Sequence, residues 1–485
     1  MNELIRINEA DSVAVALRSI NKGENINGLE LLENIPMGHK VALKDIRKGE
    51  RIIKYGFPIG EALTAIPRGA HVHTHNTRTL LSGAHEYEYY PTHPTLQPQS
   101  PETFSGYMRH DGRAGVRNEL WIIPTVGCVN DVALALEHEA SQYAEHVRAF
   151  THPYGCSQMG EDQEHTRQVL ADLATHPNAG GVLLLGLGCE NSGIDTIKPY
   201  MKDYDPERVR FLVSQDVHDE IEAGMSLIRE LIDRMSRDSR VPCETSKLII
   251  GLKCGGSDGL SGITANPAIG AFSDMLISQG GTAILTEVPE MFGAETILMN
   301  RCRDEATYRK TVKLINDFKN YYASCGQPVY ENPSPGNKAG GITTLEDKAL
   351  GCTQKSGSAP VNDVLAYGER VVTHGLNLLS APGNDLVAST ALAAAGAQIV
   401  LFSTGRGTPF GCPVPTVKIS SNSGLAERKS KWIDFNAGTL AEGGTIHDKA
   451  RELFDYVLGV ANGENTRNEL NNFQGMAIFK TGATL

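Results

Sequence analysis

Residues 180–188, GGVLLLGLG, form a short apolar run that ends in glycines. Similar runs occur at 119–126 (ELWIIPTV) and 208–214 (RVRFLVS), and the amphipathic stretch EDQEHTRQVLADLA (161–174) lies between them. Apolar strands that alternate with helices are typical of a parallel sheet covered by helices. The sequence therefore predicts a central α/β domain at 106–240.

A second series of the same kind follows after a polar segment at 238–246. It contains the apolar runs KLIIGLK (247–253) and AQIVLFSTG (397–405) and ends in a helical pattern at 447–463. We expect a C-terminal α/β domain at 246–485. Both α/β domains should be doubly wound, mostly parallel and Rossmann-like.

The first 82 residues carry an internal repeat instead. Each unit has an apolar residue, a turn centred on glycine and a short strand, which predicts a small all-β module. The four units are Ile20–Ile26, Ile35–Val41, Ile46–Ile52 and Ile66–Val72. Residues 83–105 hold four prolines and little apolar periodicity, so they are expected to be a linker.

Composition restricts the class of protein. Fifty-seven acidic and forty-five basic residues give a net charge of -12, which disfavours nucleic acid and anionic membranes as partners. No apolar run has the length of a membrane span, and the first twenty residues lack the pattern of a secretory leader. The nine cysteines show no CxxC spacing. We expect a soluble, cytoplasmic homo-oligomer with reduced thiols that acts on a small molecule.

The segment AHVHTHN at 70–76 closes the last repeat. Val72 occupies the inward repeat position, so strand alternation places His71, His73 and His75 on the opposite face. Imidazoles two residues apart start roughly 7 Å from each other, which suits chelation of one divalent ion. A third would need a bend, and oxygen ligands would come from elsewhere. The alternative is a solvated histidine face.

Glycine–cysteine pairs followed by polar residues stand at several strand ends: Gly127–Asn130, Gly155–Gln158, Gly188–Asn191 and Lys253–Gly256. In open α/β sheets ligands bind at the carboxyl edge of the strands. We expect these loops to line one cleft, with Asn130 binding substrate. The alternative is that each cysteine is a small residue that packs well at a tight turn.

Arginine is suited to bind a substrate carboxylate by two parallel hydrogen bonds. Arg109, Arg113 and Arg117 precede the first α/β strand, and Arg406 follows a later one; Arg113, Arg117 and Arg406 are the candidates. Each could instead be a surface residue. Candidates for acid–base catalysis are His152, Lys253, Lys338 and Glu190, with Glu287, Glu290, Glu346 and Asp347 as further acids or oxygen ligands.

Nucleotide-binding motifs are incomplete. Gly186 and Gly405 each begin a GxGxxG pattern that lacks its third glycine, and there is no Walker A sequence. A small-molecule acid is therefore favoured over NAD.

Several of these motifs resemble the altronate and galactarate dehydratase family, and the resemblance covers the whole chain. They include HVHTHN (71–76), CGGSDGLSGITANP (254–267), TEVPEMFGAE (286–295) and ENPSPGNKAGGITTLEDKALGCTQK (331–355). The resemblance implies an N-terminal SAF (β-clip) domain on an α/β body. It also implies elimination of water from a hexonate or hexarate with Fe²⁺ or Mn²⁺.

Within this family the motifs imply conversion of D-altronate to 2-dehydro-3-deoxy-D-gluconate in galacturonate catabolism. His71, His73 and His75 stand where the family has its histidine-rich strand. Galactarate or a related sugar acid is the alternative substrate. The chain could instead be a dehydratase whose iron–sulfur cluster uses three of Cys128, Cys156, Cys189 and Cys254, or a sugar-acid binding protein without catalysis.

Overall fold

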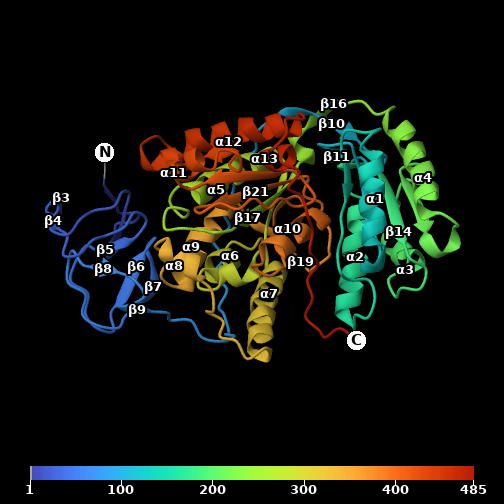
Figure 1. Ribbon diagram of the computed structural model, residues 1–485. Coiled ribbons are helices and arrows are strands. Elements are labelled where there is room, and N and C mark those ends of the chain that lie inside the picture. Colours follow the sequence, from blue (N-terminus) through green and yellow to red (C-terminus); the bar gives the residue numbers. More distant parts are fainter. Residues whose placement is uncertain (1–2) are drawn as a thin grey trace.

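The computed structural model describes residues 3–485 and shows three bodies in a row (Figure 1). The N-terminal β module lies at one end, the C-terminal α/β domain in the middle and the second α/β domain at the other end. The spatial order therefore differs from the order along the chain. The predicted fold class, a β module followed by two α/β domains, is confirmed.

The N-terminal module is built from short antiparallel strands. One sheet has the order β1-β2-β5-β8, a second has the order β6-β7-β9, and β3 pairs with β4. The bounds are β1 Leu4–Ile5, β2 Val13–Ala16, β3 Asn25–Ile26, β4 Leu29–Glu30, β5 Lys40–Ala42, β6 Arg51–Lys54, β7 Phe57–Ala62, β8 His71–Val72 and β9 Thr77–Arg78.

The sequence repeat has a direct structural counterpart. The first isoleucines of the units pair as bridges, Ile20 with Ile35 and Ile46 with Ile66, and all four are buried. The glycine of each unit has a φ between 81° and 90°, a backbone conformation that other residues rarely adopt. The repeat thus encodes a turn that only glycine forms without strain.

The second domain contains a parallel sheet of order β13-β12-β14-β15. Helices α1 and α4 cover one face, and α2 covers the other. The bounds are β12 Glu119–Pro124, α1 Asn130–Ala140, β13 Val147–Ala149, α2 Glu161–Ala174, β14 Ala179–Gly186, α3 Ile194–Ile197, β15 Val209–Val213 and α4 Glu220–Met235. Strand β14 is buried along its whole length because both faces of the sheet are covered.

The C-terminal domain contains a parallel sheet of order β19-β20-β18-β17-β21-β22-β23. Its strands are β17 Ile249–Cys254, β18 Thr282–Leu285, β19 Val361–Leu365, β20 Gly375–Leu379, β21 Ile399–Thr404, β22 Thr416–Ser420 and β23 Phe435–Asn436. Its helices are α5 Ala265–Ser278, α6 Glu295–Met299, α7 Glu305–Ser324, α8 Pro335–Ala339, α9 Leu345–Cys352, α10 Asp385–Ala394, α11 Ser423–Arg428, α12 Ile446–Ala461 and α13 Arg467–Leu470. None of the helices in residues 3–485 is long and apolar enough to cross a membrane.

The chain passes between the second and C-terminal domains through two antiparallel strands. Strand β10 (Thr103–Met108) leads in and pairs with β16 (Val241–Glu244), which leads out, while β11 (Ala114–Gly115) pairs with β10. An apolar cluster that includes Trp121 and Leu392 extends across both domains. The two α/β domains therefore share part of their core.

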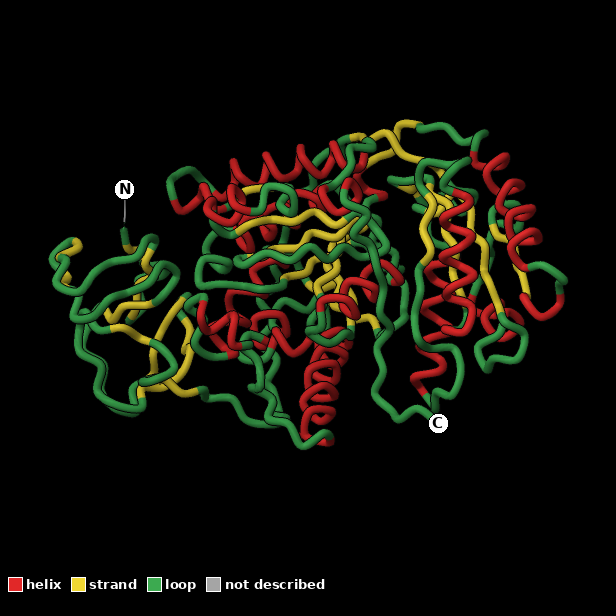
Figure 2. Tube along the Cα trace, viewed as in Figure 1, coloured by secondary structure: helices red, strands yellow, loops and turns green. Residues whose placement is uncertain are grey.

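Two further segments tie the bodies together. Before β10, the connection from the β module runs along the C-terminal domain (Figure 2), where the Tyr87 hydroxyl donates to Glu295 at 2.7 Å. At the other end of the chain, the backbone N–H groups of Thr481 and Gly482 donate to the Asp162 carboxylate in the second domain, at 2.8 and 2.6 Å. The connection is thus anchored to the C-terminal domain, and the C-terminal end of the chain is anchored to the second domain.

Candidate active site

The carboxyl edge of the seven-stranded sheet has a topological switch point. From β17 the chain continues to β18, which pairs with one side of β17. Strand β21, much later in the chain, pairs with the other side of β17. The loops that follow β17 and β21 touch there, since the N–H groups of Gly405 and Arg406 donate to the carbonyl of Gly256 at 3.1 and 3.0 Å. Ligands of open α/β sheets bind at such points.

The β module covers this edge. His39 Nε2 lies 3.3 Å from the Ala339 carbonyl, and Lys40 Nζ donates to the Gly341 carbonyl at 2.7 Å. The approach is so close that a Cβ on Gly259 would lie 1.9 Å from the Gly38 carbonyl oxygen. Glycine is required at that contact because any side chain would separate the module from the sheet edge.

Four histidines of the module gather at this interface. The ring centroid of His39 lies 5.1 Å from that of His71 and 5.0 Å from that of His73, while His71 lies 5.4 Å from His73 and 5.5 Å from His75. Strand β8 ends at Val72, and a turn closes with the Asn76 N–H donating to the His73 carbonyl at 3.0 Å. The sequence pattern required such a bend if all three histidines were to approach one ion.

His39 is a member of the cluster that the sequence interpretation missed. It stands just before β5, which pairs with β8 so that Val41 faces His71. The signal was present in the repeat, because the units at 35–41 and 66–72 both carry a histidine near the start of their strand. Aligning the repeats would have brought the two histidines to adjacent strands.

Burial lowers the pKa of His39, and it lowers the pKa of His71 to about 4 and that of His73 to about 3. These rings are therefore neutral at pH 7, which is the form that binds metal. His39 Nδ1 lies 3.0 Å from His71 Nε2, and no three of the imidazole nitrogens lie within 4.8 Å of one another in residues 3–485. Neutral imidazoles are suitable ligands for a divalent ion, but the four rings do not converge on one point in this arrangement.

A buried ion triad fixes the module beside the cluster. Asp347 Oδ2 lies 2.7 Å from Lys40 Nζ, and its Oδ1 lies 2.9 Å from Lys54 Nζ. The two ammonium groups outweigh the effect of burial and hold the pKa of Asp347 well below its usual range. Asp347 sits in α9, so the triad joins the module to the C-terminal domain and is structural.

Beneath the edge lies a second buried charge network. Lys253 at the end of β17 forms ion pairs with Glu287 and with Asp385, the latter at 2.9 Å. Lys348 pairs with Glu290 at 2.8 Å, and Lys355 lies 3.5 Å from Glu287. Glu287 has a φ of 67°, a strained conformation for a non-glycine residue that directs its carboxylate beneath β17.

The charge network does not suit Lys253 to the role of catalytic base, one of the roles considered for it in acid–base catalysis. Burial lowers its pKa, but the carboxylates of Glu287 and Asp385 outweigh burial and raise it above the usual range. Lys253 is consequently an ammonium ion near pH 7 and cannot serve as the neutral base. It is a fixed cation that stabilises the carboxylates under the sheet edge.

Two predicted cations at the edge are free of ion pairs. Arg406 is exposed, and its side chain lies beside Gly336 and Gly256. Lys338 is partly exposed in α8, the helix next to the histidine cluster. Within residues 3–485, neither side chain makes a salt bridge. Both can therefore meet an anionic ligand between the module and the sheet.

The other predicted arginines are already engaged. All five N–H groups of Arg117 are used, by Glu469 and by the carbonyls of Val116, Val460 and Glu464. Arg109 is likewise buried against main-chain carbonyls. Arg117 therefore has no N–H group left for a substrate carboxylate. Its partners Glu469, Val460 and Glu464 lie far along the chain, so local sequence could not indicate them.

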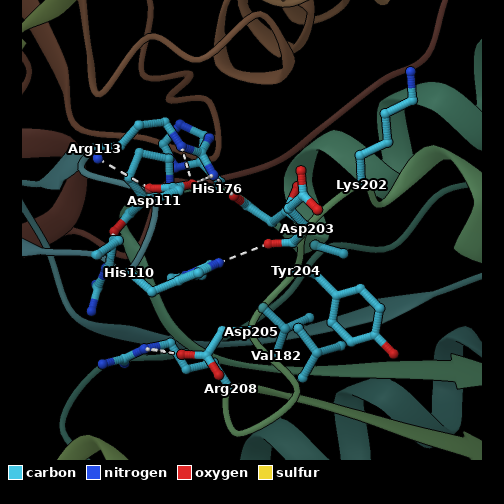
Figure 3. Close-up of a pocket in the computed structure, with 16 residues that line it drawn as sticks. His110, Asp111, Arg113, His176, Val182, Lys202, Asp203, Tyr204, Asp205 and Arg208 are labelled. Atoms are coloured by element: carbon cyan, nitrogen blue, oxygen red, sulfur yellow. Dashed lines mark hydrogen bonds and ion pairs between the residues drawn. The ribbon is translucent and has the colours of Figure 1, made fainter.

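Arg113 lies at the amino edge of the second domain's sheet, in the pocket drawn in Figure 3. Its Nε donates to Asp111 at 2.7 Å and its Nη2 donates to the Thr175 carbonyl at 2.7 Å. This edge is opposite to the one where ligands bind in α/β sheets. Arg113 thus makes local loop contacts in a pocket away from the carboxyl edges of the two sheets.

His152, Glu190 and Asn130 gather at the carboxyl edge of the second domain. His152 Nε2 lies 2.7 Å from the Pro124 carbonyl, Glu190 accepts from the Thr125 hydroxyl at 2.6 Å, and Asn130 donates to the His152 carbonyl at 2.9 Å. Because β12 and β14 belong to a different sheet from β17, three of the four glycine–cysteine loops lie on the second domain and one lies on the C-terminal domain.

The cysteines of these loops are likewise divided between the second domain and the C-terminal domain. Cys128, Cys156 and Cys189 are exposed on loops of the second domain, whereas Cys254 is buried in the C-terminal domain. Within residues 3–485, no three of the four cysteine sulfur atoms considered for an iron–sulfur cluster lie within 4.8 Å of one another. All nine cysteines are free thiols.

Comparison with known proteins identifies the family. The model described as D-galactarate/Altronate dehydratase, C-terminal matches residues 245–484, and D-galactarate dehydratase/Altronate hydrolase, second domain matches residues 106–236. Altronate/galactarate dehydratase SAF domain matches residues 2–80. The chain therefore belongs to the D-galactarate/altronate dehydratase family.

Curated relatives refine this placement. The chain is 55% identical to altronate dehydratase of Bacillus subtilis and 53% identical to altronate dehydratase of Escherichia coli, with 100% of both chains covered in each case. It is 34% identical to galactarate dehydratase (L-threo-forming) of Escherichia coli over 95% of this chain and 93% of that protein. The family resemblance seen in the sequence motifs is confirmed.

Proposed function

We propose that this chain is an altronate dehydratase, a hydro-lyase that converts D-altronate to 2-dehydro-3-deoxy-D-gluconate in galacturonate catabolism. The observation that carries the proposal is identity of 53–55% over full length to two altronate dehydratases, against 34% to a galactarate dehydratase. The free thiols of all nine cysteines agree with the reducing cytoplasm.

We propose Fe²⁺ or Mn²⁺ as the cofactor, held by His71, His73 and His75 with His39 beside them. The support is the neutral, clustered imidazoles at the covered sheet edge. When bound, such an ion supplies a Lewis acid for the carboxylate and 2-hydroxyl of the sugar acid.

The protein's own groups would bind the substrate and move its protons. Arg406 can hold the substrate carboxylate by two hydrogen bonds, since its guanidinium is unpaired. Elimination transfers the proton on carbon 2 to a base, and the 3-hydroxyl leaves with a proton as water. The resulting enol then becomes the keto acid. Lys338, a cation at this edge that forms no ion pair within residues 3–485, is the candidate for donating the proton to the departing 3-hydroxyl.

Removal of metal is expected to abolish activity. Protein treated with excess chelator should lose keto-acid formation from D-altronate and regain it with Fe²⁺ or Mn²⁺, because proton removal next to a carboxylate needs a Lewis acid. Mg²⁺ added to the same sample is the control, since it binds imidazole poorly. Full turnover in excess chelator would contradict the proposed cofactor.

Substrate choice tests the proposed specificity. D-altronate should have a much higher kcat/KM than galactarate, although the two acids are alike in having a carboxylate, a 2-hydroxyl and a 3-hydroxyl. They differ at carbon 6, where galactarate has a second carboxylate. Burial of that charge without a partner costs several kcal/mol. Equal or better turnover of galactarate, measured with Fe²⁺ present, would keep the reaction class and replace the substrate.

A further inference from the structure

A trio of potential metal ligands lies under the sheet edge, apart from the histidine cluster. Cys254 Sγ lies 3.0 Å from Glu290 Oε2, Cys352 Sγ lies 3.2 Å from the same oxygen, and the two sulfur atoms are 3.4 Å apart. In residues 3–485 these three side chains form the one group of three or more ligands within 4.8 Å of one another. We propose that they bind a thiophilic divalent cation, of the Fe²⁺ or Zn²⁺ class, as a second metal site.

The distances are close to those of a coordinated ion. Two thiolates at 2.3 Å from a tetrahedral ion are about 3.8 Å apart, so the two sulfur atoms need to separate by only a few tenths of an ångström. The ligands come from three segments of the chain: the end of β17, the 3₁₀ turn Val288–Met291 and the end of α9. An ion here would join these segments beneath the covered edge.

Glu290 is already arranged as a ligand. Glu290 Oε1 forms an ion pair with Lys348 at 2.8 Å. The thiols of Cys254 and Cys352 both lie next to the other oxygen, Oε2. The carboxylate is therefore held in one orientation by a partner on the far oxygen, in the way that outer groups orient metal ligands. Cys254, Glu290 and Cys352 are all buried, at 1%, 4% and 4% exposure.

The surrounding charge permits such an ion. Three lysines of the network (Lys253, Lys348 and Lys355) stand against three carboxylates (Glu287, Glu290 and Asp385). A divalent ion that replaces the two thiol protons leaves the total buried charge unchanged. Two thiolates and one carboxylate select Fe²⁺ or Zn²⁺ over Mg²⁺ and Ca²⁺, which prefer oxygen ligands only.

There is also a route to the site. A narrow pocket between the β module and the sheet edge is lined by Tyr55, Ser257, Lys348 and Cys352. Three protein ligands leave a fourth position of a tetrahedral ion for water, an arrangement that differs from closed structural sites.

Cobalt provides the test, because Co²⁺ bound to thiolate gives a near-ultraviolet charge-transfer band. Reduced, metal-free protein titrated with Co²⁺ should develop this band and reach saturation at no more than two equivalents, because the histidine cluster can take up Co²⁺ without giving the band. Cys254→Ser and Cys352→Ser should each lose most of its intensity. Glu290→Gln keeps both thiols and should keep the band but bind roughly tenfold or more weakly.

The controls separate this site from others. Cys302→Ser and Cys412→Ser remove buried thiols whose neighbours are threonine hydroxyls, so the band should persist in both. It should also persist in His73→Ala, because His73 belongs to the separate histidine cluster. The band is measured without substrate, so this result does not depend on the proposed function. Absence of the band from the wild-type protein, or its survival in both Cys254→Ser and Cys352→Ser, would overturn the proposal.

Discussion

His73→Ala is expected to lower metal affinity or kcat/KM with D-altronate by at least roughly a hundredfold, the upper range for loss of metal-site support. His73 is next to both His39 and His71 in the cluster. Its Nδ1 also lies 3.3 Å from the Thr343 hydroxyl, so it connects the cluster to the C-terminal domain. Its removal therefore affects the ligand set and the contact with the sheet edge together.

The measurement is steady-state kinetics at several Fe²⁺ concentrations, together with the metal content of the purified variant. His447→Ala is the matched control, because His447 is an exposed histidine in α12 and should retain wild-type kinetics. Wild-type activity and metal affinity in His73→Ala would mean that the histidines form a solvated or structural cluster. The proposed metal ion would then have to be bound elsewhere.

Asp347→Ala is expected to lower the free energy of unfolding by about 3–5 kcal/mol, the usual cost of removing one partner from a buried ion pair. The substitution leaves the ammonium groups of Lys40 and Lys54 without a carboxylate, and their side chains are 0% and 2% exposed. The resulting charge is buried and unpaired. Detachment of the β module, which allows water to reach both lysines, is the expected first event.

Urea unfolding followed by circular dichroism measures this effect. Asp317→Ala is the control, since its partner Lys313 is 75% exposed and such surface pairs contribute less than about 1 kcal/mol. Asp347→Asn keeps the volume of the side chain, so its loss in free energy of unfolding should lie between those of Asp347→Ala and Asp317→Ala. Equal stability of Asp347→Ala and Asp317→Ala would show that the module does not depend on the triad.

Much of the fold could be predicted from local patterns. Apolar runs and helical periodicity indicated both α/β domains, because burial of a parallel sheet on two faces leaves a strong local signal. The repeat in the β module was equally clear, since each turn needs a glycine with positive φ. These features depend on residues that are close in sequence.

The site could be predicted only in part, because it depends on contacts between distant residues. The turn after Val72 supplies the bend that the sequence interpretation required for three histidines, whereas the role of Arg406 stays a prediction. Arg117 does not, since its carboxylate partner Glu469 is 352 residues away. Cys352, at the end of α9, carried no local sign of its proximity to Cys254, which lies at the end of β17.

The Lys40–Asp347–Lys54 triad also has a consequence for biosynthesis. Asp347 follows Lys40 by 307 residues and Lys54 by 293 residues. At a translation rate of about 5–20 residues per second, the carboxylate leaves the ribosome roughly 15–60 s after the lysines. During this interval a nascent β module keeps both lysines hydrated on its docking face. Sealing of the sheet edge therefore has to wait at least until the C-terminal domain has been made as far as Asp347.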